Sequence, residues 1–295
     1  MRRIILLVTV LLLSLPGAAV GQTRTRTLNV GDAVINYEVS GKAKAPAVVF
    51  IHGWAHNLSV WDDQVPVFNK RYRVVRYDSP GYGRSTGISD ESAEPTDLLV
   101  LLEALHIRHA IIVGHSRGGG IALRFAAAYP KMVDGLVLYG AAPPSDFPYP
   151  PEVGKLFFSL PGIAKQYGLD SVKKVLLTSN IAWVPPGRND VSERYERLWS
   201  SYSGKDLLNP HPESGRVPNP NMARLSSIRI PTLVITGDHE MPFIAAAADT
   251  FAHRIPSSRK VVIPNAGHGA HFAQPAAFNS ALLDFFADVE RTRKR

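Results

Sequence analysis

Six short apolar runs, rich in Val and Ile, constrain the fold of this chain more than any other feature. They occupy residues 47–51, 73–77, 109–113, 135–139, 232–236 and 260–263. Nearly continuous apolar runs of this length suit strands that are buried on both faces, so each is predicted to be a strand inside a sheet. Helical patterns lie between most of them, for example at 96–105, 119–128 and 276–287. This alternation predicts an α/β fold with a mostly parallel sheet flanked by helices.

A hairpin before the buried strands and a proline-rich region between two of them set the predicted domain boundaries. Residues 28–39 read as a hairpin of two short strands around Gly31 and Asp32, ahead of the first buried strand. Residues 143–222 contain 12 of the 23 prolines and show helical patterns without a good buried strand. Because a structureless connection of that length is uncommon in a compact domain, we expect a helical cap inserted after the sixth strand. The core is then split into 22–142 and 223–295.

The predicted cap is rich in aromatic residues. Most of them are expected to pack the cap onto the core, and a few to line a pocket. The residues are Phe147, Tyr149, Phe157, Phe158, Trp183, Trp199 and Tyr202.

Residues 1–21 differ from the rest of the chain in composition. Arg2 and Arg3 precede an apolar run at 4–15, which is followed by Pro16 and then by small residues. This order is typical of a secretory signal peptide, and the run is shorter than the roughly 20 residues that cross a bilayer. We therefore expect a secreted or periplasmic protein without stable membrane insertion after cleavage. An uncleaved N-terminal anchor is the alternative.

Composition excludes several classes of function. The chain has no cysteine, which rules out a disulfide framework, a thiol nucleophile, zinc fingers and iron–sulfur clusters. Its net charge is +8, but the basic residues are scattered apart from a short group at the C-terminus, and no nucleic-acid motif is visible. We expect no nucleic-acid partner, and any nucleophile must be oxygen or nitrogen.

The five residues 114–118, Gly-His-Ser-Arg-Gly, follow one predicted strand and open the next helix. That setting is the one a nucleophile elbow requires, with Ser116 as the nucleophile. A sharp turn from strand to helix strains the backbone at the serine, and glycines on either side avoid a collision of side chains. The bare pattern is common by chance, so its position between strand and helix carries the prediction.

A serine nucleophile also needs donors where negative charge develops on the attacked carbonyl oxygen. His52, Gly53 and Trp54 follow the strand at 47–51, and the backbone amides of Trp54 and Arg117 are predicted to form this oxyanion hole. The alternative for His52 and His56, a metal pair at four-residue spacing, lacks an obvious third ligand. No metal site is expected.

The general base must be a histidine that a carboxylate orients. His268 lies in the glycine-flanked loop after the strand at 260–263, and His271 is its rival. The loop after the strand at 232–236 offers two carboxylates, Asp238 and Glu240. Either could hold the imidazole tautomer, so the residues alone leave this choice open.

With these residues in place, the chain resembles the α/β-hydrolase-fold enzymes from Leu28 to Val289. The order nucleophile, acid, histidine is that superfamily's order. The turn at 78–85 is similar to the family's turn after the fourth strand, which helps to shape the pocket mouth, although it also reads as a plain structural turn.

The resemblance also bears on the acid. Family members commonly carry Gly-x-x-Asp after the strand that begins here at 231–233. Glu240 occupies the last position, so the resemblance favours Glu240 as the acid and leaves Asp238 as the alternate. Arg117 stands where the family often has an apolar or small residue, and its side chain is given no role.

The resemblance implies acyl transfer through a covalent intermediate on Ser116, with His268 as base and no metal or organic cofactor. Serine at the elbow argues against the family's dehalogenases and epoxide hydrolases, which use aspartate there. The predicted function is therefore an exported serine hydrolase of small to medium esters or lactones. One alternative is a carbon–carbon bond hydrolase, although such relatives usually have Asn where this chain has His115. From another class, a non-catalytic ligand-binding member of the same fold would typically lack a triad residue.

Overall fold

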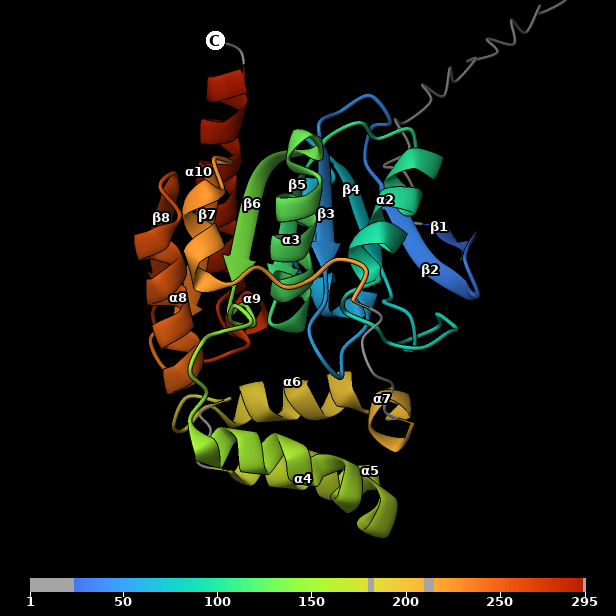
Figure 1. The fold of residues 1–295 in the computed structure, drawn as a ribbon, viewed down its shortest axis with the longest axis vertical. Helices are drawn as coiled ribbons and strands as arrows, with labels where there is room; N and C mark the ends of the chain where they lie inside the picture. Colours follow the sequence, from blue (N-terminus) through green and yellow to red (C-terminus); the bar gives the residue numbers. More distant parts are fainter. Residues whose placement is uncertain (1–23, 180–182, 210–214, 294–295) are drawn as a thin grey trace, which may run out of the picture.

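An eight-stranded sheet forms the centre of the protein in the computed structural model, which describes residues 24–179, 183–209 and 215–293 (Figure 1). The strands are β1 (Arg24–Val30), β2 (Ala33–Ser40), β3 (Ala47–Ile51), β4 (Arg73–Tyr77), β5 (Ala110–His115), β6 (Val133–Tyr139), β7 (Thr232–Gly237) and β8 (Ser258–Ile263). Their order in the sheet is β1-β2-β4-β3-β5-β6-β7-β8. The predicted α/β fold with a mostly parallel sheet is confirmed. The predicted signal peptide at 1–21 lies outside the described residues.

The predicted hairpin at 28–39 forms as β1 and β2, which pair antiparallel and turn at Gly31 and Asp32. Gly31 has φ +55°, a left-handed conformation that glycine adopts without steric cost. β2 also pairs antiparallel with β4, whereas the pairs from β4 to β8 are parallel. The carboxyl ends of the parallel strands therefore meet at one edge of the sheet.

Helices cover both faces of the sheet (Figure 1). The helices of the core are α1 (Val65–Phe68), α2 (Glu94–Ala104), α3 (Arg117–Ala128), α8 (Pro242–Arg254), α9 (Ala270–Ala273) and α10 (Pro275–Arg293), with 3₁₀ turns η1 (Leu58–Trp61), η2 (Pro130–Met132) and η3 (Met222–Ser227). Apolar residues of α2, α3 and α8 share one buried cluster, and those of α1 and α10 share another on the opposite face. None of the described helices is long and apolar enough to cross a membrane.

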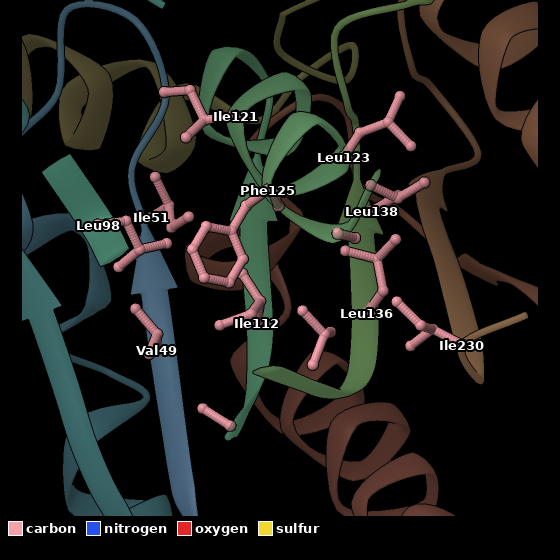
Figure 2. Close-up of a cluster of buried hydrophobic side chains, with 14 of the residues drawn as sticks. Val49, Ile51, Leu98, Ile112, Ile121, Leu123, Phe125, Leu136, Leu138 and Ile230 are labelled. Carbon is pink, nitrogen blue, oxygen red and sulfur yellow. The ribbon is translucent and has the colours of Figure 1, made fainter. Parts of the chain in front are cut away.

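Strand residues feed these two clusters alternately, as the period of two in a strand requires. In β3, Val49 and Ile51 face the α3 side, and Val48 and Phe50 face the α10 side. Figure 2 shows Phe125 of α3 lying over β3 and β5 among the aliphatic side chains of this cluster. Burial on both faces explains why these strands are apolar almost throughout.

Between β6 and β7 the described residues form helices and no strand. The helices are α4 (Pro151–Tyr167), α5 (Leu169–Thr178), α6 (Asn189–Trp199) and α7 (Lys205–Leu208). We call α4 to α7 the helical segment. It lies beyond the edge of the sheet to which the β3 and β6 arrows point in Figure 1. Its apolar residues form a third buried cluster with residues of the core loops, including Ala55, Tyr82 and Met241.

Candidate active site

Ser116 stands between β5 and α3 in a backbone conformation that non-glycine residues rarely adopt. Its φ is +54° and its ψ is −121°. The neighbouring chain holds it there, because the Ser116 N–H donates to the carbonyl of Tyr139 at 2.9 Å and its carbonyl accepts from Ala142 N at 2.9 Å. Strain of this kind persists only where the surroundings over-determine it, and it presents the hydroxyl at the start of a helix. Ser116 is half-buried.

Two glycines of the motif are required by close approach. A Cβ on Gly114 would overlap the backbone of Gly118. A Cβ on Gly118 would lie 2.5 Å from the carbonyl oxygens of Ile51 and His52. The glycines therefore allow the end of β3 and the start of α3 to pack against each other beside the serine.

His268 and Glu240 form a buried pair. His268 Nδ1 lies 2.8 Å from Glu240 Oε1, and both side chains are fully buried. Glu240 Oε1 also accepts from the backbone N–H of Met241 at 3.0 Å. An acceptor at Nδ1 keeps the proton there and leaves Nε2 unprotonated, which is the tautomer that a general base needs. Nε2 is buried and has no hydrogen-bond partner among the described residues.

The alternate acid, Asp238, holds a loop instead of the histidine ring. Its carboxylate accepts from the backbone N–H of Asn265 at 2.9 Å and of Ala266 at 3.0 Å. Burial raises the pKa of Asp238, but these two donors, together with the nearby His239, bring the pKa below the ordinary value. Asp238 thereby fixes the backbone just before His268.

The rival base, His271, packs behind the site. Its Nδ1 lies 3.0 Å from the hydroxyl of Tyr139, and its ring is fully buried. Burial holds the pKa of His271 well below the usual range, followed by the effects of His56 and His268. His271 is therefore a neutral ring, and the structure gives the carboxylate of Glu240 to His268.

The main chain of His268 is tied to the strands that carry Ser116. Its carbonyl accepts from the Tyr139 hydroxyl at 2.5 Å and from His115 Nε2 at 2.9 Å. Tyr139 also accepts the Ser116 N–H through its own carbonyl. The ends of β5 and β6 thus position the serine and the histidine together.

The loop after β3 lies against the serine. A Cβ on Gly53 would lie 3.1 Å from the Cβ of Ser116. His52 Nε2 accepts the N–H of Ser79 at 3.0 Å, so Nδ1 carries the ring proton and donates to Gly53 O at 2.8 Å. Both ring nitrogens of His52 are therefore used to fix the loop, which leaves neither for a metal ion. The turn at 78–85, through Ser79, supports the same loop.

Arg117 is the first residue of α3, so its N–H has no acceptor within the helix and remains available for a ligand. Its guanidinium forms a buried ion pair with Glu94 and donates to Ser89 at 2.9 Å. It also lies 4.8 Å from the centre of the Tyr82 ring. The side chain that had no role from sequence thus anchors α2 and the 78–85 turn to the start of α3.

A cavity of about 460 Å³ opens onto Ser116. Its walls are mostly apolar and include Phe157 and Trp183 of the region between β6 and β7. Trp183 also packs edge-on against the His268 ring, with centroids 4.9 Å apart. The cavity therefore brings the serine and aromatic side chains into one space, and one of these side chains, Trp183, packs on the histidine ring. A second cavity of about 830 Å³, with charged residues in its wall, shares Trp54, Glu91 and Arg117 with the first.

Residues 46–275 match the family model described as the alpha/beta hydrolase fold. The chain belongs to the α/β-hydrolase fold family. The resemblance seen in the sequence is thereby confirmed.

Relatives within this family are hydrolases. The chain is 27% identical over 263 residues to the pimeloyl-[acyl-carrier protein] methyl ester esterase of Nitrosomonas europaea, covering 85% of this chain and 98% of that protein. It is 31% identical over 267 residues to a 2-hydroxy-6-oxononadienedioate/2-hydroxy-6-oxononatrienedioate hydrolase of Paraburkholderia phymatum, covering 85% and 90%. Among solved structures, a hydrolase from Pseudomonas aeruginosa PA01 matches with a TM-score of 0.76 and 26% identity, covering 89% of this chain and 98% of that one. These relatives support hydrolase activity for this member of the family.

Several residues around the site were not singled out from sequence. Glu94, Tyr139 and Asp206 come from segments remote from the motifs, and their contacts depend on how the chain folds in three dimensions. Asp206 alone had a signal within reach, as an acidic residue in an aromatic-rich segment.

Proposed function

We propose that this α/β hydrolase cleaves carboxylic esters or lactones through an acyl-enzyme on Ser116. One observation carries the proposal: a fully buried Glu240 carboxylate lies 2.8 Å from Nδ1 of His268, in a loop tied to the strand ends that present Ser116. A carboxylate and an imidazole buried together, with Nε2 free of other hydrogen-bond partners among the described residues, and a serine in a strained strand-to-helix turn are the parts that nucleophilic catalysis by serine needs.

In the proposed first step, His268 Nε2 takes the hydroxyl proton of Ser116 as Oγ bonds to the substrate carbonyl carbon. The negative charge moves to the carbonyl oxygen, where the backbone N–H groups of Trp54 and Arg117 donate to it. The tetrahedral intermediate collapses, the carbon–oxygen bond to the alcohol breaks, and His268 returns its proton to the departing alcohol. Glu240 stabilises the imidazolium each time it forms and holds the His268 ring in the orientation that proton transfer needs.

In the second step a water molecule takes the alcohol's place. His268 removes one proton from it, and the resulting hydroxide attacks the acyl-enzyme carbonyl. The same two backbone N–H groups donate to the oxyanion that forms. The bond to Oγ breaks, Ser116 regains its proton from His268, and the carboxylic acid leaves. A lactone follows the same course, except that the alcohol and the acid remain one molecule.

The cavity favours a neutral, apolar group beside the scissile carbonyl. Its volume of about 460 Å³ suits a small to medium acyl or alcohol group. The guanidinium of Arg117 at its edge is already paired with Glu94, so it offers no unpaired cation to a substrate carboxylate.

Carbon–carbon bond hydrolysis is the second candidate, because the relative that is 31% identical carries that kind of name. The substrate in that name is a dioate with two carboxylates, for which the paired Arg117 is poorly suited. Turnover of short p-nitrophenyl esters, compared with turnover of a dienone-type carbon–carbon substrate, separates the two.

Labelling with a fluorophosphonate tests the proposal. We expect the intact mass to rise by one probe, the Ser116→Ala variant to remain unlabelled, and both labelling and p-nitrophenyl ester turnover to disappear together in that variant. Folding of Ser116→Ala is checked by circular dichroism. A folded wild-type protein that neither labels nor turns over any ester would overturn the proposal and favour a non-catalytic binding protein.

We also propose that the protein is exported to the periplasm or the medium. The support is the composition of residues 1–21. Fractionation of expressing cells, with the mass of the exported form, tests this; a mass lacking about 21 residues is expected, and full-length protein confined to the cytosol would contradict it.

A further inference from the structure

The carboxylate of Asp206, on α7 of the helical segment, gathers three hydrogen-bond donors. Oδ2 accepts from the indole N–H of Trp54 at 2.6 Å and from the hydroxyl of Tyr82 at 3.1 Å. Oδ1 accepts from the hydroxyl of Tyr202 at 2.6 Å. Two of these donors belong to the core and one to the helical segment, so the carboxylate joins the two parts beside the active site.

The side chain of Trp54 packs against the region between β6 and β7, so the position of its ring depends on this contact with Asp206. The rings of Phe157 and Tyr202 pack edge-on against its ring, with centroids 6.4 and 5.4 Å away. The next residue, Ala55, has φ +60°, an uncommon conformation for alanine that the surroundings must maintain. The orientation of the Trp54 peptide is therefore coupled to where its ring is held.

The second partner, Tyr82, extends the contact to Arg117, the residue after the serine. The guanidinium of Arg117 lies 4.8 Å from the centre of its ring, and its ring also packs edge-on against His52 at 5.4 Å. Asp206 therefore contacts one residue of the proposed oxyanion hole directly and reaches the other through one ring.

The chemistry of the donors keeps the carboxylate in the acceptor role. Burial, and then the Asp206 carboxylate, raise the pKa of Tyr202 far above its ordinary value. Burial also raises the pKa of Tyr82. Both phenols thus keep their protons, and the indole N–H can only donate.

We propose that Asp206 is a positioning residue of the active site, which holds the Trp54 ring and thereby aims the Trp54 N–H at the oxyanion. This inference rests on the proposed function, because it assigns a role in the same ester hydrolysis. It adds that the helical segment contributes to the chemical step as well as to substrate binding. The transition state, in which the oxyanion is fully charged, depends on a well-aimed donor more than the bound ester does.

The test compares steady-state ester hydrolysis by the wild type, Asp206→Asn, Asp206→Ala and Trp54→Phe. Loss of a single oxyanion donor costs about 100- to 1,000-fold in kcat, and a misaimed donor should cost less. We expect Asp206→Ala to lower kcat roughly 10- to 100-fold and leave KM within about threefold. Affinity for a trifluoromethyl ketone, which forms a tetrahedral adduct with the serine, should fall by the same factor as kcat/KM.

A double-mutant cycle shows whether Asp206 acts through Trp54. Trp54→Phe removes the indole donor while it keeps an aromatic ring and the backbone amide. If the contact is responsible, the Asp206→Asn/Trp54→Phe protein loses no more activity than the worse single variant. Multiplying losses would mean independent roles and would overturn the proposal. Asp206→Asn keeps side-chain volume and Trp54→Phe keeps an aromatic ring, so the cycle stands even if Asp206→Ala folds poorly.

The matched control is Asp170→Asn on α5, whose carboxylate is 98% exposed and pairs only with Lys173 three residues on in the described chain. Its kcat should equal that of the wild type. Ester turnover by the wild type together with wild-type kcat in Asp206→Ala would refute the positioning role alone. Absence of ester turnover and labelling in the wild type would remove the proposed function and this inference with it.

Discussion

Replacing Glu240 by glutamine, next to the same change at Asp238, tests which carboxylate orients the base. Both residues follow β7, two positions apart, and the residues alone did not separate them. In the structure, Glu240 Oε1 lies 2.8 Å from His268 Nδ1 within a fully buried pair. Asp238 is 38% exposed, and its carboxylate accepts backbone N–H groups of the loop before His268.

The difference in burial sets the expected magnitudes. In the transition state His268 becomes a cation, and Glu240→Gln replaces its buried counter-charge by a neutral amide that can also turn its NH₂ toward Nδ1 and favour the wrong tautomer. Loss of the orienting carboxylate in a serine triad costs about 10⁴ in kcat. Because the glutamine oxygen can still accept from Nδ1, we expect a fall of roughly 10² to 10⁴, or about 3 to 5 kcal/mol at 1.36 kcal/mol per tenfold.

Asp238→Asn should act on stability more than on catalysis. The asparagine oxygen can still accept one of the two loop N–H groups, so about one hydrogen bond worth roughly 1 kcal/mol is lost. The loop keeps its other tie, and kcat should stay within about fivefold of the wild type.

Stopped-flow hydrolysis of p-nitrophenyl acetate measures both variants, with urea unfolding to report stability. The reasoning is refuted if Asp238→Asn lowers kcat more than Glu240→Gln does while both proteins remain folded. A Glu240→Gln variant with wild-type kcat would also remove the carboxylate from the mechanism.

Three further predictions address packing and pH. Gly118→Ala should cost about 1 to 3 kcal/mol of stability, since its Cβ would meet two carbonyl oxygens at 2.5 Å; Gly162→Ala, with no atom within 4 Å of its Cβ, should be neutral or stabilising in urea unfolding, and equal losses would contradict this. Burial and then Glu94 raise the pKa of Asp97 to about 6. Ionisation of this half-buried group therefore costs stability as the pH rises from about 4 through 6, so Asp97→Asn should add about 1 kcal/mol at pH 8, after allowance for solvent screening, and little below pH 4. Thermal unfolding at both pH values checks it, and an equal gain at both would exclude a titration effect. Burial lowers the pKa of His56 to about 3. Below pH 6.5 the unfolded protein binds a proton at His56 that the folded protein does not bind, so stability is lost as the pH falls from 6.5 toward 3. Between pH 7 and pH 5 the His56→Phe variant should therefore lose about 2 kcal/mol less of its free energy of unfolding than the wild type. Equal losses of the two proteins in urea titrations would contradict this.

The strands could be predicted because burial on both faces produces a continuous apolar run in the local sequence. The runs at 47–51 and 73–77 coincide with β3 and β4, and the other four lie within two residues of the observed bounds. A strand buried on both faces must be apolar throughout, whichever neighbours it has. The start of α3 was predicted two residues late, because Gly118 and Gly119 are poor helix formers that close packing requires at this point.

The same distinction holds in the site: features that depend on neighbouring residues could be predicted, and contacts between residues remote in sequence could not. Ser116 could be placed from its flanking residues, since the strained turn needs a strand, a helix and glycines that are contiguous in sequence. The choice between Glu240 and Asp238 could not be made from residue chemistry alone, because it depends on which carboxylate points inward after β7. The ion pair of Arg117 with Glu94 joins residues that are 23 positions apart, and no local sequence pattern predicts it.

The geometry separates the groups proposed for the chemistry from most of those that surround the substrate. Ser116, Glu240 and His268 follow strands of the sheet, whereas ten of the seventeen residues that line the cavity come from the region between β6 and β7. Changes within that region should therefore alter KM and substrate preference while leaving the reactivity of the serine toward a small probe intact. Asp206 breaks this separation because its carboxylate reaches across to Trp54 and Tyr82. A substitution on the helical segment that lowers kcat without changing KM should accordingly map to Asp206 or to the rings around it, and not to the apolar wall of the cavity.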